Sequence, residues 1–375
     1  MRSRMAMKQI QLGILVFLII LLAVHTDSRS EAIYAGWAVG DSWGGYGTVL
    51  RSTDSGTTWV RQGAGQIADA NMIGVFALTP SSAWVVGEPQ GGYATIYQTT
   101  DGGSTWIRKG SPNMADTDYV PEVSLAKVHA AGSHVWAVGS GGTILHSSDD
   151  GRTWENTYPL WYGTYYLQGV YALDSTTVWV TGDTKDKYAT ILKTTDCGRT
   201  WTRQSGGDVG TSEYLLGVSA ADADTAWAVG QGYTLLKTTD GGETWTRHPD
   251  FNGLGDINEV DAVSSSTVWV ATDNEVVWST DGGRTWNHSS VHGLSGAIAF
   301  MGVSAVSDRQ AWTSFNFSDQ FIAGTDDGGV TWTKTEWLNG MHLPNMNNIS
   351  FATRPINFSP WNLFLPAINS SHAGE

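Results

Sequence analysis

Acidic side chains are the first candidates for chemistry in this sequence of 375 residues. Cleavage of a glycosidic bond needs two carboxyl groups that face each other across a cleft, one as the acid and the other as the base or nucleophile. The carboxylates most available for this role lie between the repeated segments described below: Asp116, Asp118, Glu122, Glu213 and Asp256. No spacing singles out a pair among them, and solvated loop carboxylates are the simpler interpretation. The sequence therefore favours a protein without catalytic residues, with a glycoside hydrolase as the alternative.

Seven other aspartates recur at one position of an octapeptide. Two of its copies read TTDGGSTW, ending at Trp106, and TTDGGETW, ending at Trp245, and the last tryptophans of successive copies are 41 to 48 residues apart. The aspartates are Asp54, Asp101, Asp149, Asp196, Asp240, Asp281 and Asp327. Because seven equivalent copies favour a structural part over a catalytic or calcium-binding one, we expect each octapeptide to form a tight hairpin. There the carboxylate would accept backbone N–H bonds and a glycine would adopt a positive φ.

Histidine and cysteine show no pattern that predicts a metal site or a cofactor. His288 and His292 are four residues apart, but they lie in a Ser/Gly-rich segment without the helix that would align them. Cys197 is the single cysteine, so an internal disulfide is impossible and stability must come from core burial. We expect no metal and no cofactor.

Tyrosine and tryptophan are frequent in the segments between octapeptides, where they would be available for binding. Each joins a large apolar face to a hydrogen-bonding group, so it can stack on a sugar ring or anchor a protein partner. The candidate binding residues are Trp43, Tyr119, Trp161, Tyr162, Tyr165 and Tyr166. Covering the strand ends of neighbouring repeats is the alternative role for most of them. Trp161 and Tyr162 match no repeat position and are therefore the strongest candidates.

These residues need a framework, and the sequence predicts an all-β one. The chain has 45 glycines and 19 tryptophans but only 15% charged residues, which is typical of short strands joined by tight turns. A second tryptophan series, with members such as VWAVG at Trp136 and AWAVG at Trp227, also has seven copies in step with the octapeptides. One unit shows four short strand segments, at 216–220, 225–229, 234–238 and 244–247. Repeats of this kind predict a seven-bladed β-propeller with four-stranded antiparallel blades, and the candidate aromatic residues would lie on the face opposite the octapeptide hairpins.

The two ends of the repeat region predict how the ring closes. Residue 33 begins directly with a segment of the second-strand type, so the first blade lacks its innermost strand. The segment 348–354 has the pattern of the innermost strands of other repeats, and we expect it to complete the first blade and remove exposed edges. The propeller would then span residues 33–354, and residues 355–375 would form a C-terminal tail that fits no blade.

The first 32 residues have the layout of an export signal. Arg2, Arg4 and Lys8 precede an apolar run at 12–24, which is short for a membrane span of about 20 residues. Residues 1–32 are thus expected to be a signal peptide or an N-terminal anchor. The protein would be exported to an extracellular, periplasmic or lumenal compartment, with membrane association through this segment if it is not cleaved.

The charge of the chain limits its partners. Residues 1–32 hold four of the 21 Lys and Arg and two of the 36 Asp and Glu, so the remainder has 17 basic and 34 acidic residues. This acidic excess disfavours nucleic acids and anionic membrane surfaces, since both are bound through clustered Lys and Arg. At least ten of the 17 basic residues lie inside, beside or just after the octapeptides. A protein client or a glycan is the expected partner, and a lectin is a further alternative.

The octapeptides resemble the BNR, or Asp-box, repeat of sialidases and xyloglucan-degrading hydrolases. With both tryptophan series considered, the unit is most similar to the photosystem II assembly and stability factor family, over about residues 33–354. In the third unit the resemblance rests on Trp136, Gly139, Gly142, Ile144, Leu145, Asp149, Gly151, Thr153 and Trp154. It implies an exported, seven-bladed, non-catalytic propeller that binds a protein client. The family's client-binding surface is arginine-rich, whereas the basic residues here belong largely to the repeat, so the resemblance implies a binding role rather than a photosynthetic client.

Overall fold

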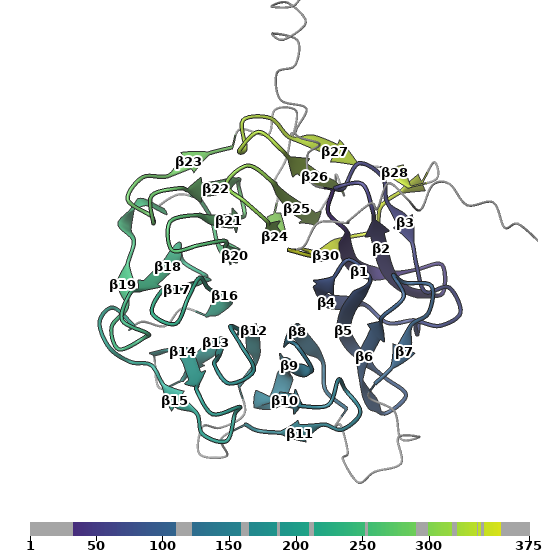
Figure 1. Ribbon diagram of the computed structural model, residues 1–375, viewed down its shortest axis with the longest axis horizontal. Coiled ribbons are helices and arrows are strands. Elements are labelled where there is room, and N and C mark those ends of the chain that lie inside the picture. Colours follow the sequence, from purple (N-terminus) through teal and green to yellow (C-terminus); the bar gives the residue numbers. More distant parts are fainter. Residues whose placement is uncertain are drawn as a thin grey trace, which may run out of the picture. The chain divides into compact units, whose positions relative to one another are not determined.

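Seven four-stranded antiparallel sheets form a ring, which confirms the predicted seven-bladed β-propeller (Figure 1). The computed structural model describes residues 33–109, 122–158, 165–185, 188–209, 214–251, 254–289, 299–316, 321–335, 337–338 and 341–353. The chain divides into two units, Met1–Ile33 and Tyr34–Glu375, and every described strand belongs to the second. In these ranges, no helix has the length and apolar character needed to cross a membrane.

Each sheet is one blade, whose strands we call a to d from the centre of the ring outward. Listed in this order, blades 1 to 7 are β30 (Met346–Phe351), β1 (Gly36–Trp43), β2 (Tyr46–Ser52) and β3 (Val60–Arg61); β4 (Met72–Thr79), β5 (Ser82–Gln90), β6 (Tyr93–Thr99) and β7 (Ile107–Arg108); β8 (Leu125–Ala131), β9 (His134–Gly139), β10 (Ile144–Ser147) and β11 (Glu155–Asn156); β12 (Leu167–Ala172), β13 (Val178–Lys185), β14 (Tyr188–Thr194) and β15 (Thr202–Arg203); β16 (Leu215–Ala220), β17 (Ala226–Gly230), β18 (Thr234–Thr238) and β19 (Thr246–Arg247); β20 (Ile257–Ala262), β21 (Val268–Thr272), β22 (Val276–Ser279) and β23 (Asn287–His288); β24 (Ala299–Ala305), β25 (Ala311–Asn316), β26 (Ile322–Thr325) and β27 (Thr333–Thr335). Outside the blades are the hairpin of β28 (Trp337–Leu338) and β29 (Met341–His342) and the 3-10 helices Ser140–Gly142 and Pro249–Phe251.

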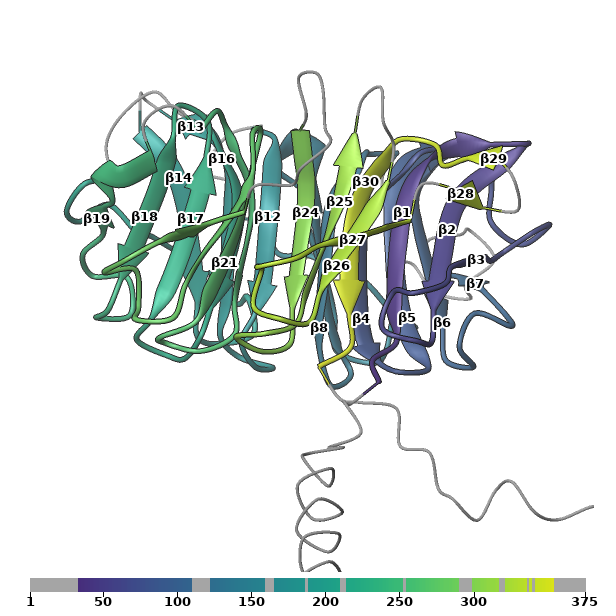
Figure 2. The same cartoon turned by 90° about the horizontal axis from the view of Figure 1, so that it is seen from above.

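The strands run along the axis of the ring, so their connections gather on its two faces (Figure 2). The a–b and c–d hairpins, which include all seven octapeptides, form one face, which we call the hairpin face. The b–c and d–a connections form the opposite face. Because neighbouring strands of an antiparallel sheet alternate in direction, every blade presents the same connections to the same face.

The ring closes as predicted, because the last strand completes the first blade. β30 pairs antiparallel with β1, with Gly36 opposite Phe351, so the first and last strands of the propeller lie side by side (Figure 1). The Phe351 ring stacks on Trp312 of blade 7 at 3.6 Å between centroids and meets Trp59 of blade 1 edge to face at 5.8 Å. This aromatic cluster joins the last blade to the first.

Each octapeptide aspartate is held inside its own hairpin. In blade 5 the Asp240 carboxylate accepts the Thr244 N–H at 2.9 Å, the Thr244 hydroxyl, and the Thr238 hydroxyl at 2.8 Å. Gly242 has a φ of +94°, as the hairpin requires. The hydrogen bonds, first of all the one from the Thr244 hydroxyl, lower the pKa of Asp240 to about 2.

The two tryptophan series form the contacts between blades. The b-strand tryptophan of one blade meets the octapeptide tryptophan of the next edge to face, as Trp179 meets Trp245 at 5.7 Å between ring centroids. The same arrangement joins Trp84 to Trp154, Trp136 to Trp201, Trp227 to Trp286 and Trp269 to Trp332. The b-strand tryptophans are fully buried, so these pairs supply much of the core between sheets.

Candidate binding site in the central channel

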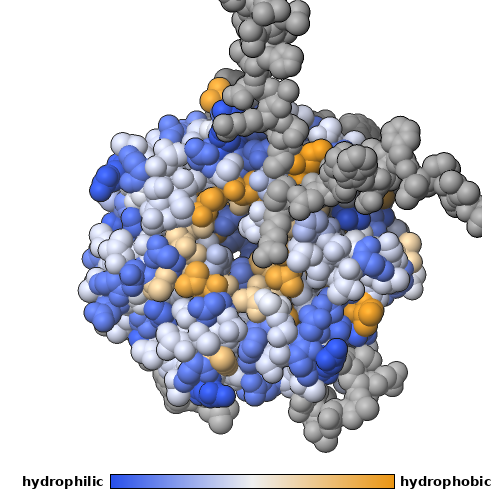
Figure 3. Space-filling model, in the orientation of Figure 1, coloured by the Kyte–Doolittle hydropathy of each residue, from blue (hydrophilic) through white to orange (hydrophobic). Residues whose placement is uncertain are grey.

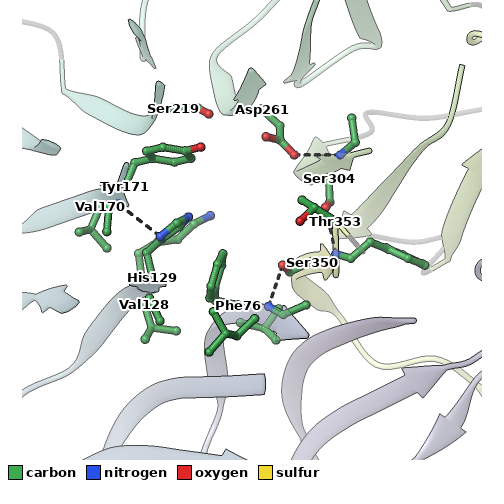
Figure 4. A pocket seen from close by; sticks show the side chains of 18 of the residues that line it. Phe76, Val128, His129, Val170, Tyr171, Ser219, Asp261, Ser304, Ser350 and Thr353 are labelled. Atoms are coloured by element: carbon green, nitrogen blue, oxygen red, sulfur yellow. Dashed lines mark hydrogen bonds between the residues drawn. The ribbon is translucent and has the colours of Figure 1, made fainter. Parts of the chain in front are cut away.

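The innermost strands of the seven blades surround a cavity of about 790 Å³ at the centre of the ring (Figure 4). Residues at the C-terminal ends of strands a, such as Thr79 and Gly132, line it. These ends lead into the a–b hairpins, so the cavity opens on the hairpin face, where Figure 3 shows a central opening. The described members of the predicted aromatic site, Trp43, Tyr165 and Tyr166, lie at the strand ends of the opposite face.

One register between strands a and b repeats in all seven blades. In each, one strand-a residue pairs with the b-strand tryptophan: Phe76 with Trp84, His129 with Trp136, Tyr171 with Trp179, Ser219 with Trp227, Asp261 with Trp269, Ser304 with Trp312 and Ser350 with Trp37. Because side chains alternate between the two sides of a strand, this residue shares a side with those two positions before and after it. The channel is therefore lined by three layers, each with one residue from every blade.

The three layers differ in chemistry. The middle layer consists of the residues that pair with the tryptophans. The deep layer, two positions earlier, consists of Gly74, Lys127, Gly169, Gly217, Glu259, Gly302 and Asn348. The mouth layer, next to the hairpin face, consists of Leu78, Ala131, Leu173, Ala221, Val263 and Val306, and of Thr353 in blade 1, where Ala352 is buried in the core. The entrance is thus mostly apolar, and hydrophobic surface lies beside the central opening in Figure 3.

Three polar side chains cross the deep layer. Lys127 of blade 3 and Glu259 of blade 6 form an ion pair across the channel, with side chains only 19% and 8% exposed. The Asn348 amide is assigned the orientation in which both of its ends form hydrogen bonds. Its oxygen then accepts a hydrogen bond from Lys127 Nζ at 2.8 Å, and its nitrogen donates one to the Val75 carbonyl at 3.3 Å. Burial lowers the pKa of Lys127 to about 8, while the charge of Asp261 opposes this shift.

Glycine at two of the other four deep positions makes room for this cluster. A Cβ at Gly217 would lie 3.0 Å from Glu259 Oε1, and a Cβ at Gly302 would lie 3.2 Å from the Asn348 side-chain amide. Both distances are shorter than ordinary van der Waals contacts. The layer therefore has space for three long or branched polar side chains because four blades contribute none.

Three aromatic rings from blades 2 to 4 form one side of the middle layer, which we call the aromatic arc: Phe76, His129 and Tyr171 (Figure 4). The His129 ring lies between the other two, with centroids 3.9 and 4.5 Å away. Its Nδ1 accepts the Ala172 N–H at 3.3 Å, which assigns the proton of the neutral imidazole to Nε2. Burial, and then the charge of Lys127, lower the pKa of His129 to about 3. His129 is therefore uncharged at neutral pH.

Four polar side chains from blades 5, 6, 7 and 1 form the other side, which we call the polar arc. Each accepts a backbone N–H from strand a of the next blade at 2.8 to 3.0 Å: Ser219 from Ala262, Asp261 from Ala305, Ser304 from Phe351 and Ser350 from Ala77. These hydrogen bonds link adjacent blades around the channel. The Tyr171 hydroxyl bonds to Ser219 and so joins the two arcs.

Asp261 is the only carboxylate in the middle layer. Its Oδ2 accepts the Ala305 N–H at 2.8 Å, whereas no residue in the described ranges donates a hydrogen bond to Oδ1. The side chain is half-buried and points into the channel (Figure 4). Burial raises the pKa of Asp261 to about 6, although the Ala305 N–H and Lys127 oppose the shift. One carboxylate oxygen thus faces the cavity.

The two predicted catalytic carboxylates that the structure describes, Glu122 and Asp256, do not come together. Glu122 is exposed at the start of blade 3, whereas Asp256 precedes strand a of blade 6 and accepts the Gly232 N–H at 3.0 Å. These blades lie on opposite sides of the ring (Figure 1). The other three candidates, Asp116, Asp118 and Glu213, lie outside the described residues. Glu122 and Asp256 therefore do not form an acid–base pair.

The predicted aromatic binding residues are only partly described. Trp43 packs on the Arg61 guanidinium at 4.9 Å from the ring centroid, and Arg61 also donates to the Trp43 carbonyl. Tyr165 and Tyr166 precede strand a of blade 4, where their carbonyls accept backbone N–H bonds. Since blades 1 and 4 are not neighbours, the structure does not bring these three residues together. Tyr119, Trp161 and Tyr162 lie outside the described residues.

The seven octapeptide aspartates surround the hairpin face but do not line the cavity. Each accepts the N–H of the threonine four residues later at 2.8 to 2.9 Å. Across the described part of the chain, no three His, Cys, Asp or Glu side chains are grouped so that they could hold a metal ion.

The channel residues carry a signal that the sequence reading missed. Strands a share a Gly-Val pair, as in GVYA at 169–172 and GVSA at 217–220, and Lys127, Glu259 and Asn348 replace the glycine in three blades. An alignment of the seven strands would have shown these departures from the repeat. The side chains of Lys127, Glu259 and Asn348 meet in one channel because the closed ring brings blades 3, 6 and 1 to a common axis.

Solved structures share this fold at low sequence identity. A YCF48 structure described as bound to D1 peptide has a TM-score of 0.54 and 17% identity, over 71% of this chain and 81% of that chain. YCF48 from Cyanidioschyzon merolae has a TM-score of 0.53 and 18% identity, over 71% and 85%. The GH74 xyloglucanase from Xanthomonas campestris has a TM-score of 0.54 and 13% identity, over 86% of this chain but 56% of that chain. A search of curated protein sequences gave no match.

The sequence itself shows the family. A family model described as Photosynthesis system II assembly factor YCF48 matches residues 89–160 and 167–308, which are more than half of the chain. The matched segments include Lys127, His129 and Asp261 of the central channel. This chain therefore belongs to the photosynthesis system II assembly factor YCF48 family.

Proposed function

We propose that this protein is a non-catalytic scaffold that binds a segment of a client protein in its central channel. The observation that carries the proposal is the cavity of about 790 Å³, which has an apolar mouth and a polar interior. Cavities of roughly 300–1,000 Å³ with apolar walls and a few placed polar groups are typical of ligand sites. The solved relative described as bound to D1 peptide supports a peptide ligand for this chain as well.

The mouth layer offers a client segment an apolar entrance. Leu78, Leu173, Val263 and Val306 are half-buried there, so some of their apolar surface is accessible. Covering that surface would favour binding by roughly 25 cal/mol per Å² removed from water. The strands that carry these residues belong to closed sheets, so the site is formed before the client arrives and little ordering is needed on binding.

A carbohydrate-active protein, either a hydrolase or a lectin, is the alternative. Hydrolysis would need two carboxyl groups about 5–10 Å apart. Glu259, two residues before Asp261, is engaged by Lys127, and the carboxylates of Glu122 and Asp256 belong to opposite blades. The described residues therefore support binding better than hydrolysis. Hydrolysis of a polysaccharide that is lost in a Glu122→Ala variant, or glycan binding that is lost in Trp161→Ala, would favour the alternative.

Site-specific photo-crosslinking tests the client proposal. A photoreactive phenylalanine derivative introduced at Leu78, in the mouth layer, is expected to form adducts with a small set of proteins in an extract of the source cells. The same derivative at Val60, which is 59% exposed on the outer strand β3, is the matched control. Adducts at position 78 that are missing at position 60 support the proposal. Equal labelling at both positions, or none at position 78, would contradict it.

We also propose that the protein is exported through residues 1–32. The basic residues before the apolar run at 12–24 support this. Mass spectrometry of the protein from its source should find an N-terminus near residue 33 if the segment is cleaved, or the intact chain in the membrane fraction if it is an anchor. An intact chain in the cytosolic fraction would contradict export.

A further inference from the structure

We infer that the central channel recognises a primary ammonium group on an aliphatic stem, such as a lysine side chain of the client, through Asp261 and the aromatic arc. This inference deepens the proposed function and rests on it, because it names the group that the client inserts. Three features of the channel lead to it: the balance of charges, the arrangement of the middle layer and the apolar mouth layer.

The channel holds one more negative than positive charge. Lys127 and Glu259 neutralise each other in the deep layer. His129 adds no charge, because its Nδ1 is occupied by the Ala172 N–H and its pKa is near 3. Asp261 therefore remains as the unbalanced charge once it is ionised. A charge with restricted access to water is unfavourable, and a bound cation would compensate it.

The middle layer places aromatic rings opposite this carboxylate. Asp261 lies on the polar arc, and Phe76 and His129 lie across the channel from it (Figure 4). Tyr171 is close enough for the charge of Asp261 to add to the burial that raises its pKa to about 12. Aromatic rings attract cations through the negative potential of their faces. Both faces of the neutral His129 ring are covered by Phe76 and Tyr171, so the faces available to a cation are those of Phe76 and Tyr171 that are turned away from His129. A cation in this layer would contact a carboxylate on one side and aromatic rings on the other.

The donor and acceptor pattern favours an ammonium over other charged groups. An anion would be repelled by Asp261. A hard metal ion would need about six oxygen ligands, whereas the hydroxyls of Ser219, Ser304 and Ser350 already accept backbone N–H bonds. A guanidinium binds best to both oxygens of one carboxylate, but Oδ2 of Asp261 is engaged by Ala305, which leaves Oδ1 for a single point charge.

The mouth layer suits the stem of a lysine. A ligand that enters from the hairpin face passes Leu78, Leu173 and Val263 before its end reaches Asp261, two positions deeper along the strands. Lysine side chains bury their methylene groups against apolar surface while the charged end reaches a polar partner. An apolar entrance in front of a half-buried carboxylate matches a methylene chain that ends in an ammonium group.

Calorimetric titration of the full chain at pH 7.5 tests the inference. The probes are 1-aminopentane, a blocked pentapeptide with a central lysine flanked by alanine and leucine, and the same peptide with that lysine acetylated. Asp261→Asn removes the charge but keeps an acceptor for the Ala305 N–H. Asp256→Asn is the matched control, since it changes a carboxylate just before the same strand, on the opposite face.

Both amine probes should bind the native chain, and Asp261→Asn should weaken binding at least about tenfold, as expected when one partner of an enclosed charge pair is lost. Asp256→Asn should change it less than about twofold, and the acetylated peptide should not bind. If Asp261→Asn does not fold, Phe76→Leu replaces it, with an expected loss of about three- to thirtyfold from the missing aromatic face.

The other outcomes would decide for or against the ammonium site or the protein client. Equal binding of the acetylated and free peptides, or unchanged binding in Asp261→Asn, would overturn the inference while leaving the proposed function intact. Binding of 1-aminopentane without the lysine peptide would support the ammonium site but contradict a protein client. Failure of all three probes to bind the native chain would overturn the inference.

A pH series gives an independent readout. Affinity should fall as the pH is lowered through about 6, because Asp261 becomes protonated and its charge is lost. The other titratable groups facing it are Lys127, Glu259, His129 and Tyr171. Neither His129, with a pKa near 3, nor Tyr171, with a pKa near 12, changes charge in this range, and Lys127 loses its charge only above about 8. Affinity that does not change between pH 7.5 and 5 would count against Asp261.

Discussion

Lys127 and Glu259 form an ion pair across the central channel and connect blades 3 and 6, which are not neighbours in the ring. Most contacts of a propeller join adjacent blades, so this pair is unusual in reaching across the axis. It also determines the chemistry of the channel, because it cancels two charges and leaves Asp261 as the remaining one.

Breaking this pair should destabilise the fold. Lys127→Met is expected to lower the free energy of unfolding by about 3 kcal/mol, since it leaves Glu259 charged, enclosed and unpaired. Adding Glu259→Gln should recover most of the loss because the unpaired charge is removed. Urea denaturation followed by tryptophan fluorescence measures both changes. A double variant no more stable than the single one would show that the ion pair does not cause the effect.

Replacing Cys197, which has a left-handed backbone conformation, by glycine should stabilise the fold. Cys197 has a φ of +62° at the octapeptide position where four other blades have glycine with positive φ. Cys197→Gly is expected to raise the free energy of unfolding by up to about 1 kcal/mol, because a side chain is unfavourable in this conformation. Gly242→Ala is the opposing control, since its Cβ would lie 2.6 Å from the Trp179 ring. Thermal unfolding should shift upward in the first variant and downward in the second.

The closure of the ring should depend on one aromatic side chain. Phe351→Ala removes the ring that stacks on Trp312 and meets Trp59, and is expected to lower the free energy of unfolding by about 3–5 kcal/mol. Val330→Ala, which shortens a 78% exposed side chain, should leave it nearly unchanged. Amide hydrogen exchange should also increase first in β30 and β1. Exchange that increases equally in every blade would contradict a local role at the seam.

The octapeptide hairpins should make stability sensitive to acid. Hydrogen bonds from the following threonine hydroxyl and N–H lower the pKa values of Asp240, Asp281 and Asp327 to about 2, below the ordinary value of 3.8. A group with a lowered pKa in the folded state stabilises the fold above its ordinary pKa and loses that effect as the pH falls toward the lowered value. The contribution of the hairpins to the unfolding midpoint should therefore be constant above about pH 4, where His129 and Asp261 affect stability, and should decrease between pH 4 and 2. In Asp281→Asn that decrease should be smaller.

The fold was largely predictable because its signals are local and repeated. Each octapeptide contains its own hairpin, so Asp240 and Gly242 indicate a turn without knowledge of any other blade. Strand ends also follow from this pattern, since β16–β19 begin and end within two residues of the segments predicted at 216–247. Closure was predictable because 348–354 matched strands whose role was already assigned, and β30 covers Met346–Phe351.

The channel was not predictable in the same way, because its chemistry depends on single residues that depart from the repeat. Lys127 and Glu259 are 132 residues apart and meet only because the closed ring brings strands a to one axis. Asp261 resembles any other strand residue in the sequence, and its environment depends on Lys127, Tyr171 and Ala305 from three other blades. Tyrosine and tryptophan are frequent between the octapeptides, so the sequence predicted a binding site among them. The cavity instead opens on the hairpin face.

The constant register between strands a and b has a consequence for how this protein can change. Every middle-layer residue pairs with a buried tryptophan that belongs to the framework, while its own side chain lies on the channel side of strand a. Substituting one such residue leaves the backbone pairing of strands a and b in place. Among the described residues, five of the seven side chains also accept a backbone N–H from the next blade, whereas Phe76 and Tyr171 do not. Ligand preference can therefore diverge among relatives most freely at Phe76 and Tyr171, while the architecture is retained.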